Sequence, residues 1–392
     1  MKTRFTATLA AITLLFGLAS CGGGGGGGIE GTGSALGTMR LSMTDAPACG
    51  FDAVHVTVER VRVHQSAGAV DADAGWSEVV LNPAKRLDLL TLTNGVLEPL
   101  GQTDLPAGKY TQMRLVLAPN TTAAPLANSV TPTGGAETEL TTPSAQQTGL
   151  KLNVNLDVPA GKVADFAIDF DACKSVVKRG NSGQYNLKPV ISVTPIVSDA
   201  GLRVVGYVDP SIAVGSIVVS VQQAGLPVKA TAPDPTGRFV LYPVPVGTYD
   251  LVVSAAGRVT ATMTGVPVVI TAPTTINSAT LPIAPGATTR RSVTGTLTPA
   301  TATARALQTY TGGPTVEVAW APVDATTGAF AFALPIGAPL KLAYVANPST
   351  LAFAPDTTAA AKYSIEAASG GVLKSQAIDA SAVVAPLVFS FP

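Results

Sequence analysis

The stretch Val163-Ala164-Asp165-Phe166-Ala167-Ile168-Asp169-Phe170 decides how this chain folds. Apolar and acidic side chains alternate along it with a period of two, and that period places the two kinds on opposite faces of a β-strand. The apolar set is Phe166, Ile168 and Phe170, and the acidic set is Asp165, Asp169 and, just after the stretch, Asp171. The segment therefore predicts a strand with one buried face and one acidic face.

The rest of the chain has the composition of a protein built from many short strands. Its 392 residues include 39 glycines and 30 prolines, which are residues of tight turns. No long segment has helical periodicity. We therefore predict an all-β fold with two or three domains.

Two segments carry finer expectations. Val54, Val56 and Val58 share one strand face, but the next valines, Val61 and Val63, have the opposite parity. A β-bulge near Glu59-Arg60 would absorb that shift. Residues 120–149 are rich in Thr, Pro, Ala and Gly, and this composition leaves a long loop or a weak hairpin open.

Charge and motifs exclude several classes of function. The net charge is zero and charged residues make up only 13%, so no nucleic-acid partner is expected. No phosphate-binding or dinucleotide-binding glycine motif occurs, so no cofactor is expected. A Ser-His-Asp triad would have to use His55 or His64, and the nucleophile elbow Gly-x-Ser-x-Gly is absent. We expect a protein that is not an enzyme.

The N-terminus has the three parts of an export signal. Lys2 and Arg4 are followed by a short apolar core and by Leu18-Ala19-Ser20-Cys21. This tetrapeptide resembles the lipobox of bacterial lipoproteins, which implies cleavage before Cys21 and its acylation. The glycines 22–28 would then form a flexible tether. By analogy, glycine after the cysteine favours the outer membrane of a Gram-negative bacterium. The alternative is an ordinary signal peptide with a chance cysteine.

With Cys21 used by the anchor, Cys49 and Cys173 remain as a pair in an exported, oxidising compartment. We predict a disulfide between them. Two free thiols, or half of a metal site completed by His55 and His64, are the alternatives.

Three groups are candidates for ligand binding. Asp169 and Asp171, with Asp165 or Asp157 nearby, could hold a hard cation such as calcium, and the competing interpretation is a solvated strand face. His55 with Glu59 is either a ligand pair or an exposed pair. Sugar rings could stack on three aromatic side chains that otherwise serve packing. These are Trp76, Tyr185 and Trp320.

The second half of the chain contains a repeat. Three glycine landmarks recur at offsets of 89, 91 and 90 residues, which argues for a duplicated domain. The pairs are Gly206 with Gly295, Gly237 with Gly328 and Gly247 with Gly337.

Two resemblances follow from these motifs. The first domain is similar, over nearly its whole length, to the family named domain of unknown function 4382, which implies a β-rich envelope lipoprotein and supplies no catalytic residues. Its matching segments are Leu41–Pro47, Asp88–Gly95, Leu105–Tyr110, Ile168–Asp171 and Tyr185–Pro189. The repeat resembles the carboxypeptidase regulatory-like (transthyretin-like) sandwich. In its second copy Ala338-Pro339 stands where Thr248-Tyr249 stands in the first, so the tyrosine is missing there.

The predicted organisation is a β-sandwich or barrel-like domain followed by two immunoglobulin/transthyretin-like sandwiches. We expect a non-catalytic cell-envelope lipoprotein that presents β-sandwich modules for binding or surface assembly. Its partners would be the membrane, through the N-terminal lipid, and an envelope protein or a glycan. A carbohydrate-binding lipoprotein is the alternative, and an enzyme with an unrecognised site is a third reading. The predicted bounds are 1–20 for the signal peptide, 21–33 for the lipidated cysteine and tether, and 34–198, 199–284 and 285–392 for the three domains.

Overall fold

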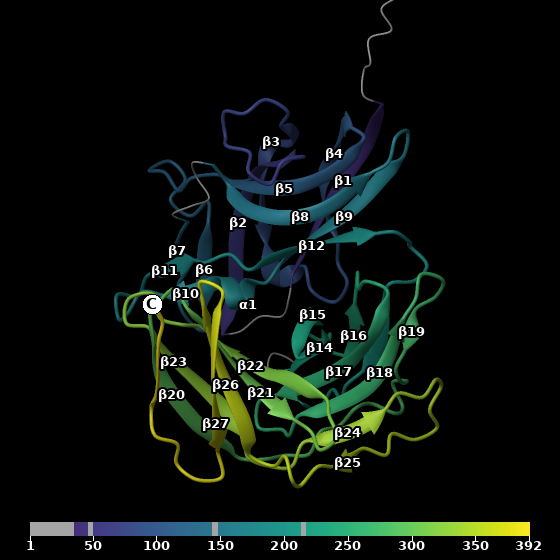
Figure 1. Ribbon diagram of the computed structural model, residues 1–392, viewed down its shortest axis with the longest axis vertical. Helices are drawn as coiled ribbons and strands as arrows, with labels where there is room; N and C mark the ends of the chain where they lie inside the picture. The colour runs from purple at the N-terminus through teal and green to yellow at the C-terminus, as the bar shows by residue number, and fades with distance from the viewer. Residues whose placement is uncertain (1–34, 46–49, 143–147, 213–216) are drawn as a thin grey trace, which may run out of the picture. The chain divides into compact units, whose positions relative to one another are not determined.

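The structure is a computed structural model that describes residues 35–45, 50–142, 148–212 and 217–392. These residues are nearly all in strands and turns, which confirms the prediction of an all-β fold. No helix among them has both the length and the apolar character needed to span a bilayer. Three groups of sheets follow one another along the chain, and we call them the first, second and third β regions (Figure 1).

The first β region contains a four-stranded and an eight-stranded sheet. The smaller sheet has the order β12-β9-β1-β4, and β9 is the stretch quoted at the outset. Its strands are β1 (Leu36–Asp45), β4 (Glu98–Pro106), β9 (Val163–Phe170) and β12 (Ile191–Ile196). The larger sheet contains β2 (Phe51–His64), β3 (Ser77–Asp88), β5 (Gly108–Leu117), β6 (Ser129–Pro132), β7 (Thr138–Thr141), β8 (Leu150–Val158), β10 (Val176–Lys178) and β11 (Tyr185–Leu187).

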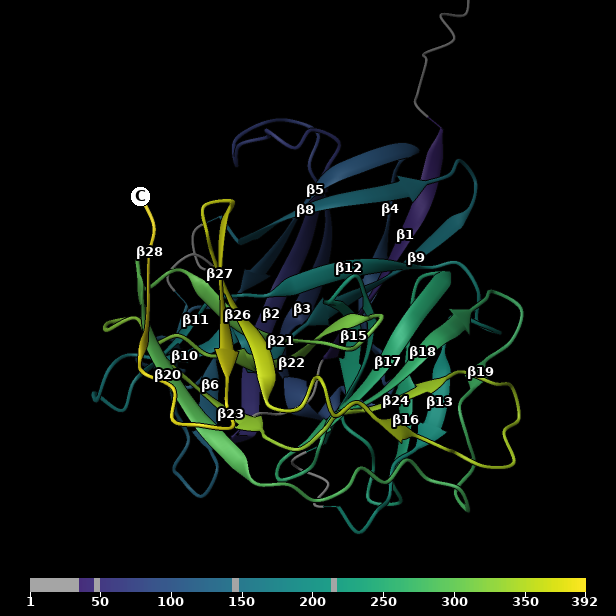
Figure 2. The ribbon, with the colours of Figure 1, turned by 60° about the horizontal axis from the view of Figure 1, so that its bottom comes forward.

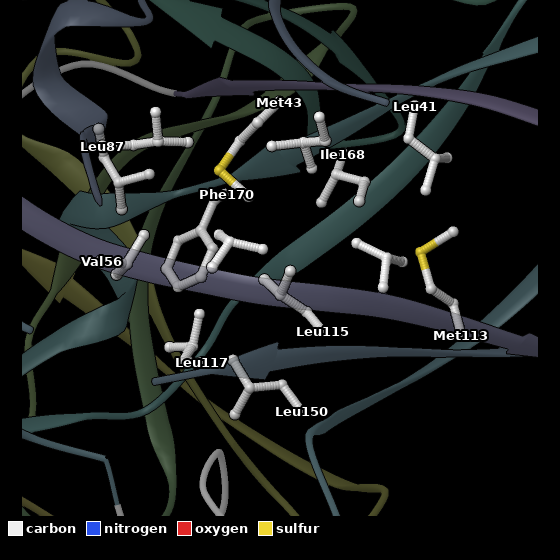
Figure 3. Packing of buried hydrophobic residues seen from close by; sticks show 14 of the residues in the cluster. Leu41, Met43, Val56, Leu87, Met113, Leu115, Leu117, Leu150, Ile168 and Phe170 are labelled. Atoms are coloured by element: carbon white, nitrogen blue, oxygen red, sulfur yellow. The ribbon is translucent and has the colours of Figure 1, made fainter. Parts of the chain in front are cut away.

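The core of this region contains the apolar face of β9. Ile168 and Phe170 are fully buried, beside Met43 of the neighbouring strand β1, and pack in one cluster with Leu115 of the other sheet (Figure 3). Burying each such side chain stabilises the fold by about 1.5–3 kcal/mol. The predicted apolar face is therefore confirmed.

Both finer expectations have an outcome in this region. The register of β2 shifts between Val58 and Arg60 in its pairing with β3 and also in its pairing with β5, which confirms the predicted bulge. Within residues 120–149, β6 and β7 pair in an antiparallel hairpin. The hairpin is therefore the correct one of the two alternatives.

The second β region has a three-stranded sheet, β16-β13-β19, and a larger sheet, β15-β14-β17-β18-β24-β25. Its strands are β13 (Val204–Tyr207), β14 (Ile217–Gln223), β15 (Leu226–Thr231), β16 (Arg238–Leu241), β17 (Gly247–Ala255), β18 (Ala261–Val268) and β19 (Thr274–Thr275). The two outermost strands, β24 (Leu340–Ala343) and β25 (Ala354–Pro355), come from much later in the chain. β24 pairs in parallel with β18, and β25 pairs with β24, so both strands extend this sheet (Figure 1).

The third β region repeats the topology of the second. Its sheets have the orders β23-β20-β28 and β22-β21-β26-β27, which correspond strand by strand to β16-β13-β19 and β15-β14-β17-β18. The strands are β20 (Arg290–Thr298), β21 (Thr303–Thr309), β22 (Thr315–Ala321), β23 (Ala329–Pro335), β26 (Lys362–Ser369), β27 (Val372–Asp379) and β28 (Leu387–Ser390).

The tyrosine expected to be missing from the third region is present at a later position. Tyr249 donates a hydrogen bond from its hydroxyl to the carbonyl oxygen of Pro245, four residues earlier. Tyr363 makes the same bond to Pro335, 28 residues earlier. The segment between Pro335 and Tyr363 contains β24 and β25, so an insertion that extends the second region displaces the tyrosine along the chain.

Side-chain contacts join the three regions. Asn94 of the first region donates its backbone N–H to Thr231 and accepts from the backbone N–H of Val240, both at 2.6 Å. The hydroxyl groups of Thr262, in the second region, and Tyr310, in the third, lie 2.8 Å apart. The regions are therefore held against one another by specific contacts as well as by the chain that connects them.

Candidate functional site

The acidic face of β9 is covered by another part of the protein. Lys229 of β15 lies 2.8 Å from Asp169, and its side chain is only 3% exposed. Asp165 pairs with Arg40 at the exposed end of the same face. The interpretation of this face as solvated is therefore wrong for Asp169, and a lysine lies beside the carboxylate that the cation hypothesis used.

Asp171 has a structural role at the end of β9. Its carboxylate accepts a hydrogen bond from the backbone N–H of Lys174 and so caps the short helix α1 (Ala172–Ser175). The ammonium group of Lys174 lies 3.8 Å from Asp171 and 3.1 Å from Glu317 of β22. The fourth acidic candidate, Asp157, is exposed on β8. Within the described ranges there is no group of three His, Cys, Asp or Glu side chains that could hold a metal ion.

Glu317 connects this cluster to the second and third regions. Its carboxylate lies 3.6 Å from Arg305, which is itself paired with Glu366. The side-chain amide of Gln222, on β14, bonds to both the backbone N–H and the carbonyl oxygen of Glu317, each at 2.8 Å. Charged and amide groups from all three β regions therefore meet at one place.

A cavity of about 540 Å³ lies at this meeting point. Asp171, Lys174 and Glu317 line it, together with small and apolar side chains of β14, β15, β22 and β23. Of the three aromatic candidates, Trp320 lines the cavity, and the Lys174 ammonium lies 5.0 Å from the centroid of its ring system. A volume of this size is typical of small-ligand sites. We take this cavity as the candidate functional site and call it the junction cavity.

Burial raises the pKa of Asp171 to about 6. Lys174 opposes the shift, and the nearby carboxylates Asp169 and Glu317 add to it. A carboxyl group whose pKa is higher in the folded than in the unfolded protein costs stability when it ionises. That cost develops as the pH rises from about 4 through 6 and is fully present at pH 7.

Replacing Asp171 by asparagine is expected to stabilise the protein at pH 7.5 and to leave its stability nearly unchanged at pH 4. Asparagine can still cap α1 but cannot ionise, so the gain is at most about 3 kcal/mol, at 1.36 kcal/mol per pKa unit. Thermal unfolding at both pH values measures it, and Asp157→Asn serves as the exposed control. An equal loss at both pH values would show that Asp171 acts chiefly as a partner of Lys174.

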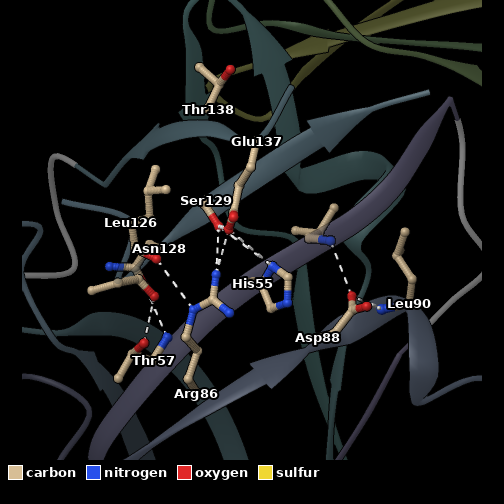
Figure 4. A network of polar contacts seen from close by, with 12 residues as sticks. His55, Thr57, Arg86, Asp88, Leu90, Leu126, Asn128, Ser129, Glu137 and Thr138 are labelled. Carbon is tan, nitrogen blue, oxygen red and sulfur yellow. Dashed lines mark hydrogen bonds and ion pairs between the residues drawn. The ribbon is translucent and has the colours of Figure 1, made fainter. Parts of the chain in front are cut away.

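His55 belongs to a second polar cluster, drawn in Figure 4. Its Nδ1 lies 3.5 Å from the hydroxyl of Ser129 and 3.7 Å from Glu137, and Arg86 contacts both of those residues. The serine hydroxyl donates to Glu137 at 2.5 Å. In a catalytic triad the two histidine nitrogens face different partners. Here one nitrogen faces both, so the cluster does not have the order of a triad.

The charges of this cluster favour a neutral histidine. Burial and the Arg86 guanidinium lower the pKa of His55. The hydrogen bond from Ser129, with help from Arg86, lowers the pKa of Glu137. The sequence grouped His55 with Glu59, as a ligand pair or as an exposed pair, whereas the structure brings Glu137 to His55 from the hairpin β6–β7. The sequence did not decide between a loop and a hairpin for residues 120–149. It therefore carried no signal for the contact between His55 and Glu137.

The other candidate aromatic and histidine side chains make contacts within the protein. The ring system of Trp76 lies 4.6 Å from the guanidinium carbons of both Arg62 and Arg114, and its indole N–H donates to Val70. Tyr185 is buried. Both ring nitrogens of His64 are hydrogen-bonded to backbone groups.

The cysteine predictions depend mostly on residues outside the ranges that the structure describes. Cys21 and Cys49 both lie there. Cys173, which lines the junction cavity, is disulfide-bonded. The pairing of Cys49 with Cys173 and the acylation of Cys21 stay predictions.

Comparisons with solved structures find distant likenesses. Two interface mutants of a type II cohesin–X-dockerin complex from Acetivibrio cellulolyticus are 24% and 22% identical over 22% of this chain, each with a TM-score of 0.19. The match covers 58% and 59% of those chains, less than two thirds of their length. A streptococcal ancillary pilin is 11% identical, with 91% of this chain and 98% of that chain covered and a TM-score of 0.17. TM-scores this low do not support any conclusion about the fold or function of this chain.

A comparison with protein families is more informative. No curated protein matches the chain. Residues 36–189, however, match the family described as "Domain of unknown function (DUF4382)". This segment runs from β1 through β11 and so takes in nearly all of the first β region. The first β region of this chain therefore matches this family over nearly its whole length.

Proposed function

We propose that this chain is a non-catalytic lipoprotein of the cell envelope that presents its β regions as one binding body. The observation that carries the proposal is the junction cavity. It is lined by residues of all three regions, and Gln222 and Lys174 reach across to Glu317 there. A cavity built in this way needs the three regions to be held together, which suits binding by the whole assembly.

The N-terminal sequence supports the proposed location of this binding body at a membrane. The lipobox-like Leu18-Ala19-Ser20-Cys21 precedes the glycine run, and acyl chains on Cys21 would hold the protein at a membrane. Two or more chains give stable attachment, whereas one gives only marginal binding. By the analogy drawn from the sequence, the membrane is the outer membrane of a Gram-negative bacterium.

Replacing Cys21 by serine is expected to abolish incorporation of an alkyne-labelled palmitate and to move the protein out of the membrane fraction. Serine has no thiol to acylate, so the anchor is lost while the β regions are unchanged. Ser20→Ala is the matched control, because it keeps the thiol and a small residue beside it. Continued labelling or membrane retention of the Cys21→Ser protein would contradict the proposed anchor.

Carbohydrate binding is the second candidate, and one observation favours it. Trp320 lines the junction cavity together with Ser220 and Thr260, and an aromatic ring beside hydroxyl-bearing residues is a combination that sugar sites use. A glycan array probed with the purified protein tests this candidate. Failure to bind any sugar at millimolar concentration would remove it.

A further inference from the structure

The strand β22 is an edge strand of its sheet, and it lines the junction cavity. It pairs with β21, and no strand among the described residues pairs with its other edge. At that edge the side chain of Gln222 accepts from the N–H of Glu317 and donates to its carbonyl oxygen. A side-chain amide carries the same donor and acceptor as a peptide group. Gln222 therefore makes, at one residue, the contacts that a neighbouring strand would make.

The cavity continues along β22 beyond this contact. Val318, Ala319 and Trp320 of β22 line it, as do residues of β14 and of its partner β15. Figure 2 shows β22 and β15, which belong to two different sheets. The β14 side chains Val218 and Gln222 both line the cavity and are four residues apart, which on a strand is about 13 Å. An extended segment of about four residues has that length.

The walls are suited to small apolar side chains. Ala230, Val318, Ala319 and Ala333 all line the cavity. Two residues with hydroxyl groups, Ser220 and Thr260, also line it.

We propose that the junction cavity binds an extended peptide segment with small apolar side chains, which adds as a strand alongside β22. Main-chain hydrogen bonds to the strand edge would provide affinity, and the alanine-lined walls would select side-chain size. The segment would continue the pairing that Gln222 begins. This deepens the proposed binding function and rests on it, but it is independent of the lipid anchor.

The polar groups of the cavity favour a peptide over a sugar. A sugar needs many free donors and acceptors, but Glu317 is already paired with Lys174 and Arg305. Both amide atoms of Gln222 are bonded to Glu317. What remains available is a strand edge, an apolar wall and a few hydroxyls.

The test uses the full chain carrying Cys21→Ser, which avoids detergent, and a phage-displayed random heptapeptide library as the probe. Enriched peptides are resynthesised with a fluorophore and titrated by anisotropy. Ala230→Phe on β15 and Ala333→Phe on β23 each add a ring to the lining of the cavity and should weaken binding at least tenfold. Ala331→Phe is the matched control, because Ala331 is exposed on the same strand as Ala333 and does not line the cavity.

A second measurement tests the strand geometry. Each peptide nitrogen is methylated in turn, and strand addition predicts that methylation at alternate positions abolishes binding while the positions between tolerate it. Failure to enrich any peptide, affinity unchanged by both filling variants, or sensitivity without alternation would overturn the proposal. Sugar binding that the filling variants abolish would place the site correctly but give it the wrong ligand. None of these outcomes bears on acylation of Cys21, so the two proposals fail separately.

Discussion

Replacing Lys229 by alanine is expected to lower the free energy of unfolding by about 3–5 kcal/mol. The ammonium group of Lys229 lies 2.8 Å from the carboxylate of Asp169, and the two side chains are 3% and 14% exposed. Removing the lysine leaves the carboxyl group of Asp169 without its cation in a place that water barely reaches. The cost is therefore mainly that of an uncompensated buried charge. Urea unfolding at pH 7 measures it.

Strand β9, which carries Asp169, also carries the ion pair that serves as a matched control. Arg40 pairs with Asp165 on the same face of β9, but the Arg40 side chain is 56% exposed. An exposed ion pair contributes less than about 1 kcal/mol, so Arg40→Ala should be nearly silent. The double change Lys229→Met with Asp169→Leu removes both buried charges and should recover most of the stability lost by Lys229→Ala. If Lys229→Ala costs no more than Arg40→Ala, the buried pair does not hold the first and second regions together.

The covered acidic face shows what the sequence could not predict about β9. Alternation with a period of two identified the apolar face correctly because each residue of a strand alternates sides. It could not show what lies against the other face, since Lys229 belongs to a different β region. A lysine within the apolar run Val228 to Ala230 was a signal for a buried partner. Without the topology, its carboxylate could not be identified.

The repeat was recognised from glycines, and its third landmark marks the start of a divergence. Gly247 and Gly337 follow Pro245 and Pro335 in the two copies. After Gly337, however, the chain leaves the third region to form β24 and β25, and it returns at Tyr363. A constant offset cannot find a strand that an insertion has displaced. The hydrogen bond from Tyr363 to Pro335 identifies the corresponding tyrosine, because Tyr249 and Pro245 make the same bond.

The junction cavity was also out of reach of sequence reasoning. Trp320 was a candidate for ligand binding, and Asp171 for a cation, but Lys174, Gln222 and Glu317 had no motif that singled them out. Their roles arise from contacts between residues more than 90 positions apart. Such contacts depend on how the regions pack against one another, and the periodicity of side chains along the sequence carries no information on that packing.

Gly237 and Gly328, which end the corresponding turns Asp234–Gly237 and Asp324–Gly328 of the repeat, are the positions where a single methyl group should do the most damage. Their φ angles are +81° and +70°. A Cβ atom would lie 2.0 Å from the carbonyl oxygen of Val208 in the first case and 2.1 Å from that of Leu297 in the second. The close approach is a consequence of pairing, because Val208 and Leu297 each donate their N–H to the carbonyl oxygen of the facing glycine at 2.8 Å.

Gly237→Ala and Gly328→Ala are therefore each expected to cost about 2–5 kcal/mol. A left-handed backbone costs a residue with a Cβ about 1–2 kcal/mol, and the overlap with a carbonyl oxygen adds the 1–3 kcal/mol typical of overpacking. Gly265→Ala separates the two contributions, because Gly265 has a φ of +75° but no atom within 4 Å of the added Cβ. It should lose only the backbone part when all three variants are compared by urea unfolding. Equal losses would mean that the turn moves aside, and the carbonyl contact would then not be what requires glycine in both copies of the repeat.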